Sequence, residues 1–368
     1  MSKTQKSSPA PVQTPARAQA QTPAQTQARA QAQTPALVRV AALILALALA
    51  FAVVACNNNS TTGATGNNTG NADGLIVIGF AQVGAESNWR IANTKSMRET
   101  FSAEKGYNLI LKDAQQKLEN QLAAVRDFVA QKVDYIVIAP VSEEGWDTVL
   151  KEAKDAGIPV IIVDRMIKTT DDSLYTCWVG SDFRKEGDIA AEWIENNFKD
   201  KPGLKIVHLK GSLGSSAQIG RTEGLQAAAE RNKGWEIIYS ATADFNQPKG
   251  KEVMEFVLKQ YDSIDVLYCE NDNMAFGAIE AMDMAKKAYG LGGGVAIISF
   301  DATNAGLVAT LDGKINFNVE CNPLHGPRVE AIIKQLERGE TPDKLAYVTE
   351  EAFDAKTITQ SIIDSRDY

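Results

Sequence analysis

A regular alternation of two kinds of segment dominates the chain from Leu75 onward. Short runs of β-branched and apolar residues, typical of buried strands, alternate with longer segments that have the periodicity of amphipathic helices. This pattern predicts parallel sheets covered by helices on both faces. There are more of these strand–helix units than one sheet usually contains, so we expect an α/β fold with two doubly wound, Rossmann-like lobes. Strands are expected at residues 76–81, 108–112, 135–139, 160–163, 205–209, 236–240, 266–269 and 295–300, and helices at 88–104, 119–131, 146–156 and 185–197.

Polar side chains directly follow many of these predicted strands. In open parallel sheets, ligands bind just beyond the carboxyl ends of the strands, so these side chains should converge on one rim in each lobe. If the two rims face each other, they line a cleft. The candidate residues at the strand ends are Glu86, Trp89, Arg90, Asp113, Asp164, Arg165, Asn271 and Asp301.

Residues of these types suit a neutral sugar. An aspartate accepts hydrogen bonds from hydroxyl groups, an arginine donates them, and an asparagine does both. The apolar face of a sugar ring packs on an aromatic side chain, for which the sequence offers Trp89 and Trp146. An aspartate after a strand is also a frequent helix N-cap, so it is the joint occurrence of these residues that favours a binding cleft.

Several longer segments resemble the periplasmic binding proteins of sugar importers, in the group that binds ribose and galactose. The resemblance covers nearly everything from Leu75 to about Tyr347. The segments that support it are GFAQVG at residues 79–84, ESNWR at 86–90, DAQQK at 113–117, VDR at 163–165 and NDNM at 271–274.

The resemblance implies the type I fold of this family, in which three crossover segments join the lobes. We expect the crossovers near residues 180–182, 321–322 and 346–350. The N-terminal lobe would then comprise residues 75–181 and 322–347, and the C-terminal lobe residues 182–321 and 348–368.

The resemblance also implies ligand contacts. Where ribose-binding members have a ligand-binding arginine, this chain has Ile219, which disfavours ribose and favours a galactofuranose-like subgroup. The nearby Arg221 either takes over that contact or lies on the surface, and Glu320 either reaches the pocket or forms a salt bridge at a crossover. The matched contacts are Trp89, Arg90, Asp164, Arg165, Asn271 and Asp301, with Phe245 as an aromatic contact from the second lobe and Glu86 and Asp113 as weaker matches.

The N-terminal 73 residues differ in composition from the rest. Residues 1–55 comprise a low-complexity tract followed by an unbroken apolar run at 40–55, which is short for a membrane span and typical of a signal peptide. Small residues before Cys56 resemble a bacterial lipoprotein cleavage site, which implies a lipid anchor on Cys56. Residues 56–74 would then form a polar tether. An uncleaved anchor helix is the alternative, and either arrangement places the folded part outside the cytoplasm.

Charge and cysteine content narrow the possible partners. Residues 1–55 hold five of the 38 basic residues and no acidic one, so the rest of the chain has 33 basic and 46 acidic residues and a net charge of −13. Such a chain repels phosphate backbones, so no nucleic-acid partner is expected. The four cysteines form no CxxC pair and there are only two histidines, so neither a metal nor a cofactor is expected. Cys177 and Cys269 lie in apolar runs and are expected to be buried thiols.

These features predict an extracytoplasmic solute-binding lipoprotein, anchored at the membrane, that captures a monosaccharide between two closing lobes. It would act as a monomer and deliver the sugar to the membrane permease of an ABC transporter. Two alternatives stay open: a sensor that presents sugar to a chemoreceptor or sensor kinase, and a binder of another furanose or a nucleoside-type ligand. No enzyme is expected, because a glycosidase that used Asp164 and Asp301 would need a protonated carboxyl group, and Arg165 favours an ionised Asp164.

Overall fold

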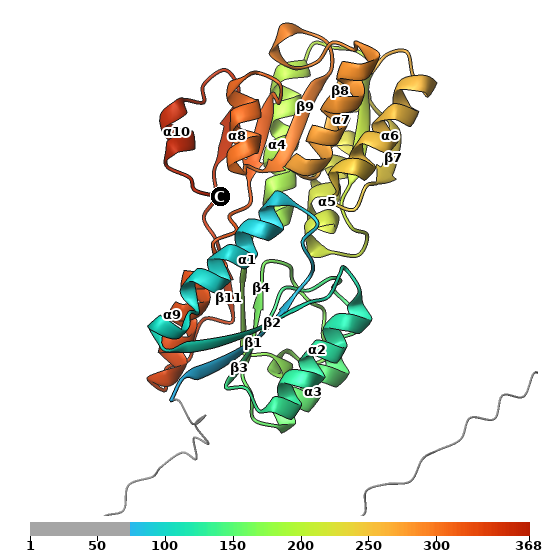
Figure 1. Ribbon diagram of the computed structural model, residues 1–368. Helices are drawn as coiled ribbons and strands as arrows, with labels where there is room; N and C mark the ends of the chain where they lie inside the picture. Colours follow the sequence, from blue (N-terminus) through green and yellow to red (C-terminus); the bar gives the residue numbers. More distant parts are fainter. Residues whose placement is uncertain (1–73) are drawn as a thin grey trace, which may run out of the picture. The chain divides into compact units, whose positions relative to one another are not determined.

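The computed structural model describes residues 74–368, which form two lobes, each built on a six-stranded sheet with helices on both faces (Figure 1). The expected fold class is confirmed. The predicted signal peptide, Cys56 and most of the predicted tether lie outside the described residues. Within residues 74–368, no helix is both long enough and apolar enough to cross a membrane.

The first lobe contains six strands and four α-helices. These are β1 (Ile76–Gln82), β2 (Tyr107–Asp113), β3 (Tyr135–Ile138), β4 (Val160–Val163), β5 (Cys177–Gly180), β11 (Leu345–Tyr347), α1 (Asn88–Thr100), α2 (Leu118–Gln131), α3 (Asp147–Asp155) and α9 (His325–Glu337). The strand order is β11-β5-β4-β3-β1-β2, and all pairs are parallel. Val77 and Ala81 of β1 pack with α2 and α3, whereas Ile78 and Phe80 pack with α1 and α9, so both faces of the sheet are buried.

The second lobe also has a six-stranded sheet with helices on both faces. Its elements are β6 (Leu204–Lys210), β7 (Trp235–Thr242), β8 (Val266–Cys269), β9 (Ala296–Asp301), β10 (Phe317–Glu320), β12 (Ala352–Asp354), α4 (Phe183–Phe198), α5 (Ser216–Arg231), α6 (Gln247–Gln260), α7 (Asp272–Ala285), α8 (Asn304–Leu311) and α10 (Gln360–Asp364). The strand order is β12-β10-β9-β8-β6-β7, in which only the β10–β12 pair is antiparallel. The helices α4 and α5 pack on one face, and α6 and α7 on the other.

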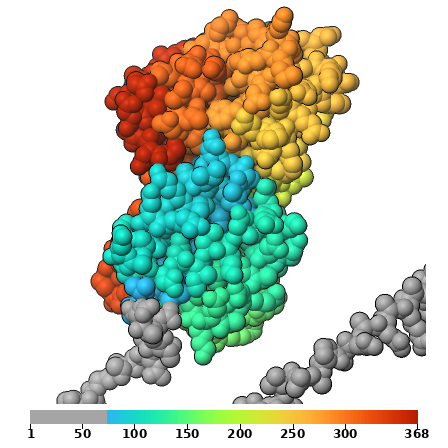
Figure 2. All heavy atoms as spheres, viewed as in Figure 1, coloured from blue at the N-terminus to red at the C-terminus, as the bar shows by residue number. Residues whose placement is uncertain are grey.

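The chain passes between the two sheets three times. β5 ends at Gly180 and α4 begins at Phe183, while β10 ends at Glu320 and α9 returns to the first lobe at His325. The third passage runs from β11, which pairs with β5, to β12, which pairs with β10. Figure 2 shows atoms of the two lobes in contact where they meet.

Some elements differ from the sequence-based expectation. The strands β5, β10, β11 and β12 were not predicted, because none of them is an unbroken run of four apolar residues, as the equally short β3, β4 and β8 are. Their pairing also depends on partners far away in the sequence. The helix expected at residues 88–104 ends at Thr100, since Phe101 leaves the helical conformation and packs its ring edge-on against Tyr107.

The cysteines of the described part, Cys177, Cys269 and Cys321, are free and buried. For Cys177 and Cys269 this agrees with the expected buried thiols. Burial raises the pKa of the Cys177 thiol to about 11, so this thiol stays protonated at neutral pH.

Gln121 of α2 joins the carboxyl ends of β1 and β3. Its Nε2 donates hydrogen bonds to the carbonyl oxygens of Ala81 at 3.1 Å and Ala139 at 2.6 Å, and its Oε1 accepts one from the N–H of Val141 at 2.8 Å. The side chain is completely buried. One amide group thus provides partners for three backbone groups at the edge of the sheet where ligands bind in such folds.

We therefore predict that Gln121→Leu lowers the free energy of unfolding by about 2–4 kcal/mol, because an isosteric apolar side chain leaves backbone groups unpartnered. Urea denaturation followed by circular dichroism measures the loss. Gln131→Leu, at the exposed end of the same helix, is the matched control and should change stability by no more than about 0.5 kcal/mol. Equal stability of the two variants would contradict this role of Gln121.

Candidate functional site

A cavity lies between the carboxyl ends of the two sheets, where the lobes meet. Its wall combines the segments that follow β1, β4, β7 and β8 with the end of β9, the first turns of α4 and α5, and the second crossover. The lining residues are Glu86, Ser87, Trp89, Arg90, Asp164, Arg165, Phe183, Ala217, Arg221, Phe245, Asn271, Asp301 and Cys321.

The structure brings most of the predicted site residues together at this cavity. They come from both lobes and are widely separated in the sequence. Those that line the cavity are Glu86, Trp89, Arg90, Asp164, Arg165, Arg221, Phe245, Asn271 and Asp301.

Two predicted site residues lie elsewhere, which corrects the sequence-based prediction. Asp113 ends β2, the edge strand of its sheet; it is exposed, and its carboxylate accepts a hydrogen bond from the N–H of Gln115 at 2.7 Å. Trp146 is completely buried in the core between the sheet and the helices α2 and α3, and its Nε1 donates to the carbonyl of Ser142 at 2.8 Å. Asp113 is therefore a turn residue and Trp146 a core residue.

The sequence left two interpretations open for Glu320 and for Arg221, and the structure places only Arg221 at the cavity. Glu320 is absent from the cavity wall; its carboxylate accepts a hydrogen bond from the Tyr368 hydroxyl at 2.5 Å and lies 3.6 Å from the Arg366 guanidinium. It thus forms the salt bridge at the crossover. Arg221 is 2% exposed and lines the cavity, so it is not a surface charge.

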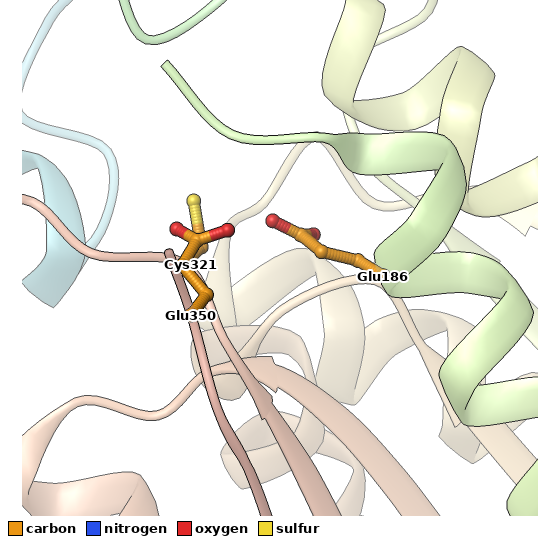
Figure 3. A group of neighbouring side chains, drawn as sticks. All are labelled: Glu186, Cys321 and Glu350. Atoms are coloured by element: carbon orange, nitrogen blue, oxygen red, sulfur yellow. The ribbon is translucent and has the colours of Figure 1, made fainter. Parts of the chain in front are cut away.

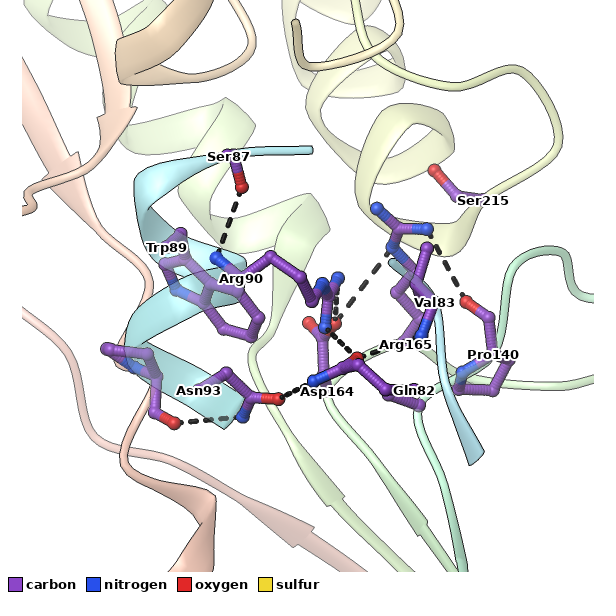
Figure 4. A network of polar contacts seen from close by, with 12 residues as sticks. Gln82, Val83, Ser87, Trp89, Arg90, Asn93, Pro140, Asp164, Arg165 and Ser215 are labelled. Carbon is purple, nitrogen blue, oxygen red and sulfur yellow. Dashed lines mark hydrogen bonds and ion pairs between the residues drawn. The ribbon is translucent and has the colours of Figure 1, made fainter. Parts of the chain in front are cut away.

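Two arginines and two carboxylates form the first-lobe wall, of which Figure 4 shows Arg90, Arg165 and Asp164. Arg90 donates from Nε to Glu86 at 3.2 Å, and its Nη2 lies 2.8 Å from Oδ2 of Asp164. The guanidinium of Arg165 lies 3.8 Å from Glu86 and 4.0 Å from Asp164. Because buried charges are costly unless they are paired, this cluster places guanidinium donors and carboxylate acceptors at defined positions.

Two carboxylate oxygens in this wall accept no hydrogen bond within the described residues, and one of them, Oδ2 of Asp164, lies 2.8 Å from Nη2 of Arg90. The Oε2 atom of Glu86 is buried and accepts no hydrogen bond, although Glu86 lines the cavity. Buried acceptors are usually satisfied, since an unsatisfied one costs about 1–3 kcal/mol. The cavity therefore presents an oxygen that a hydroxyl group of a ligand would satisfy.

Burial and neighbouring charges set the protonation of these groups. Burial lowers the pKa of Arg165 to about 10, and repulsion by Arg90 adds to this effect. For Arg90, burial acts to lower the pKa, but the carboxylates of Asp164 and Glu86 outweigh it and the pKa is raised. Both guanidinium groups are therefore charged donors at neutral pH.

Arg221 dominates the second-lobe wall. Its Nε donates to Oε2 of Glu186 at 2.6 Å, and its Nη2 lies 3.5 Å from Oδ1 of Asp301. The guanidinium also lies over the rings of Phe183 at 5.5 Å and Phe300 at 4.8 Å. Burial raises the pKa of Asp301 well above its usual value, and Arg221 opposes this only in part.

Aromatic rings from both lobes complete the cavity. Trp89 is held by a hydrogen bond from its Nε1 to the carbonyl of Cys321 at 2.5 Å. Phe245 packs beneath the guanidinium of Arg165, which lies 5.2 Å from the ring centroid. Gly211 makes room for this ring, since a Cβ at that position would lie only 1.9 Å from it.

The backbone is strained at three cavity residues. Asp164, Phe245 and Asp301 have positive φ angles of 62°, 59° and 97°. Such conformations are uncommon outside glycine, cost about 1–3 kcal/mol each and gather at functional sites. In this cavity they direct side chains from strand ends toward the space between the lobes.

Sequence reasoning missed four lining residues. Ser87 caps α1 by accepting a hydrogen bond from the N–H of Arg90 at 3.2 Å, and Ala217 lies in the first turn of α5. Phe183 follows the first passage between the sheets, and Cys321 lies in the second. Their positions at helix starts and next to the expected crossovers were available signals, but neither alanine nor an isolated cysteine has a chemistry that points to a ligand.

Two Rossmann-like lobes with a polar and aromatic cavity between their strand ends define a two-lobed ligand-binding protein. Residues 78–357 match the model of the periplasmic binding protein domain, and the chain belongs to this family. It is 41% identical to the galactofuranose-binding protein YtfQ of Escherichia coli K12 over 276 residues, which cover 73% of this chain and 85% of that protein.

Two solved structures are similar to this chain over most of its length. A protein from Mycobacterium smegmatis in complex with β-D-fucofuranose is 40% identical, with a TM-score of 0.74 over 79% of this chain and 93% of that chain. The periplasmic binding protein component of the arabinose ABC transporter of Shewanella sp. ANA-3, bound to α- and β-L-arabinofuranose, is 38% identical, with a TM-score of 0.74 over 79% of this chain and 95% of that one.

His325 supports Trp89 from outside the cavity. The two rings lie edge to face with centroids 6.0 Å apart, and Nδ1 of His325 lies 3.1 Å from the side-chain nitrogen of Asn93. Asn93 also donates to the carbonyl of Pro323 at 2.9 Å. Burial lowers the pKa of His325 to about 4, and the attraction of Asp164 offsets this only in part. The imidazole is therefore neutral at pH 7.

The lowered pKa of His325 predicts that the folded protein loses stability at acidic pH. Between pH 6.5 and about 4, His325 is protonated in the unfolded chain but not in the folded one, so stability falls as the pH drops through this window. The loss from this group reaches roughly 3 kcal/mol at the acid end. Urea denaturation at several pH values should show a shallower pH dependence for His325→Gln than for the wild type. Parallel curves would contradict the prediction.

Proposed function

We propose that the protein captures a monosaccharide in its furanose form in the cavity between the lobes and delivers it to the permease of an ABC importer. The observation that best supports this proposal is the cavity wall, in which charged hydrogen-bonding groups are held in place by one another and the Oε2 of Glu86 has no partner among residues 74–368. A neutral polyol offers hydroxyl groups that satisfy such donors and acceptors together.

The ligand class is supported by the relatives. YtfQ binds galactofuranose by its name, and the two solved structures contain fucofuranose and arabinofuranose. A furanose ring would lie between Trp89 and Phe245, with its hydroxyl groups toward Arg90, Arg165 and Asp164. Aromatic rings contact the C–H groups of the sugar, and charged groups contact its hydroxyl groups.

Entry of the sugar requires that the lobes separate. The cavity holds only about 20 Å³, room for about one water molecule. Backbone-to-side-chain hydrogen bonds join the lobes, from Asn88 to Asn273 at 2.9 Å and from Met166 to Ser216 at 2.8 Å. Opening at the crossovers would break them, and a sugar that contacts both lobes would favour the closed state.

Binding, rather than catalysis, is the proposed role of the carboxylates. Glu86 and Asp164 are each next to Arg90. Acid–base catalysis at a glycosidic bond requires one carboxyl group that gives up a proton and a second group that acts on the opposite face. Groups paired with guanidinium partners are better suited to accept hydrogen bonds.

The sugar assignment is tested by titration with galactofuranose, fucofuranose and arabinofuranose, followed by tryptophan fluorescence and calorimetry. We expect at least one to bind, and Asp164→Asn to weaken that binding about ten- to a hundredfold, the range for a lost hydrogen bond to a charged group. Asp113→Asn removes a charge outside the cavity and should leave the affinity unchanged. No response to any furanose, or equal loss in both variants, would contradict the proposal.

We propose that the protein acts outside the cytoplasm as a monomer and is anchored through a lipid on Cys56. The apolar run before this cysteine and the polar segment after it support the anchor. In cells fed a labelled fatty acid, the wild-type chain should incorporate the label and enter the membrane fraction. Cys56→Ser should abolish labelling, whereas Cys177→Ser should not. A labelled Cys56→Ser variant would refute the assignment.

A further inference from the structure

Three potential metal ligands meet in the hinge between the lobes (Figure 3). Cys321 lies in the second crossover, Glu350 in the third, and Glu186 in the first turn of α4. The Sγ of Cys321 and one carboxylate oxygen from each glutamate all lie within 4.8 Å of one another. Separate segments of the chain thus bring a sulfur and two oxygen ligands to one point.

Ser181, in the first crossover, holds two of these ligands. Its hydroxyl donates to Oε1 of Glu350 at 2.6 Å and lies 3.3 Å from the Sγ of Cys321. The N–H of Asn322 also donates to Glu350, at 2.7 Å. Hydrogen bonds of this kind orient metal ligands in known sites, so the arrangement has supporting contacts as well as ligands.

The carboxylate of Glu186 has an unused oxygen. Its Oε2 accepts a hydrogen bond from Arg221 at 2.6 Å, whereas its Oε1 is buried and has no partner in the part of the chain that the structure describes. The side chain is 3% exposed, and Figure 3 shows its carboxylate directed toward Cys321 and Glu350. Since an unsatisfied buried acceptor is costly, this oxygen independently indicates a missing positive partner.

The charges around the cluster favour such a partner. Glu186, Glu350 and Asp301 all interact with the one guanidinium of Arg221, and Arg328 is a further cation near Glu350. The guanidinium of Arg221 is thus shared by three carboxyl groups, and burial raises the pKa of each of them. A cation between Glu186 and Glu350 would stabilise their ionised forms, and any proton that they carry would go to solvent.

A path from solvent leads to the cluster. A hollow of about 190 Å³ opens on the hinge and is lined by Glu186 and Glu350 together with residues of α4, β10 and the third crossover. It is lined by different residues from the cavity between the lobes, whose wall includes Cys321 but neither glutamate. The hollow therefore brings solvent beside both glutamates on a side separate from the proposed sugar site.

We propose that Glu186, Cys321 and Glu350 form a site for a divalent transition-metal ion of the Zn²⁺ class. A thiolate with two carboxylates suits such an ion, whereas Mg²⁺ and Ca²⁺ take oxygen ligands only. The thiol of Cys321 releases its proton to solvent when the ion binds. Three protein ligands leave the fourth position of a tetrahedral ion to a water molecule.

The site would couple metal binding to movement of the lobes. It joins the second and third crossovers to α4, so a bound ion resists changes in the angle between them. Cys321 also belongs to the cavity wall, and its carbonyl holds Trp89. An ion that stabilises the closed hinge would therefore also raise the affinity of the cavity for its ligand.

The test uses Co²⁺ as a spectroscopic probe of the full chain after dialysis against a chelator. We expect one equivalent of Co²⁺ to produce the near-ultraviolet thiolate-to-metal charge-transfer band, and Zn²⁺ to displace it. Cys321→Ser should abolish the band, and Glu186→Gln should weaken binding at least about a hundredfold, because residues that merely orient metal ligands already account for ten- to a hundredfold. These readouts do not depend on sugar binding.

The other cysteines provide matched controls. Cys177→Ser and Cys269→Ser replace buried thiols outside the cluster, and Cys56→Ser replaces the cysteine outside the described residues. All three variants should keep the band. Absence of a band in the wild type, or its survival in Cys321→Ser, would overturn the proposal. If circular dichroism shows that Cys321→Ser does not fold, an unchanged Co²⁺ affinity in Glu350→Gln would overturn it instead.

Discussion

The pairing of buried guanidinium groups with carboxylates organises the region where the two lobes meet. Arg90 joins the start of α1 to the segment after β4 through Asp164, and Arg221 joins α5 to α4 through Glu186. A buried charge that loses its partner is strongly destabilising, so these pairs restrict the positions of the strand ends and helix starts. Arg90, Asp164 and Arg221 also line the cavity. The contacts that hold the rims in place therefore also prepare the hydrogen-bonding groups for a ligand.

The hinge and the cavity share parts of the chain, so movement of one must affect the other. Cys321 belongs to both, and Gly180 at the first crossover lies so close to Asp164 that a Cβ there would be 2.2 Å from its carbonyl oxygen. Close packing of this kind transmits small changes because packed interfaces do not deform continuously. In the proposed function, closure of the lobes and occupation of the cavity would thus be parts of one structural change. Ions bound at the hinge would act on the same equilibrium.

Much of the fold could be predicted because its central strands are buried on both faces. The strands β3, β4 and β8 are continuous apolar runs, and apolar residues predominate in β1. None of the strands at the crossovers contains four consecutive apolar residues. The direction of a side chain is also invisible in such patterns. Trp146 follows a strand just as a cleft residue would, but its ring turns into the core.

By itself, the sequence determined the class of fold, because the period of apolar residues depends only on local geometry. It also determined which residue types stand at the strand ends. Tertiary structure decided which of these strand ends lie next to one another at the cavity. β2 is the edge strand of its sheet, so Asp113 lies away from the cavity, whereas the segment after β4 brings Asp164 into it. Strand order and the pairing of buried charges arise from contacts between distant segments. For that reason Arg221, Cys321 and Glu186 acquire their roles only when the chain is folded.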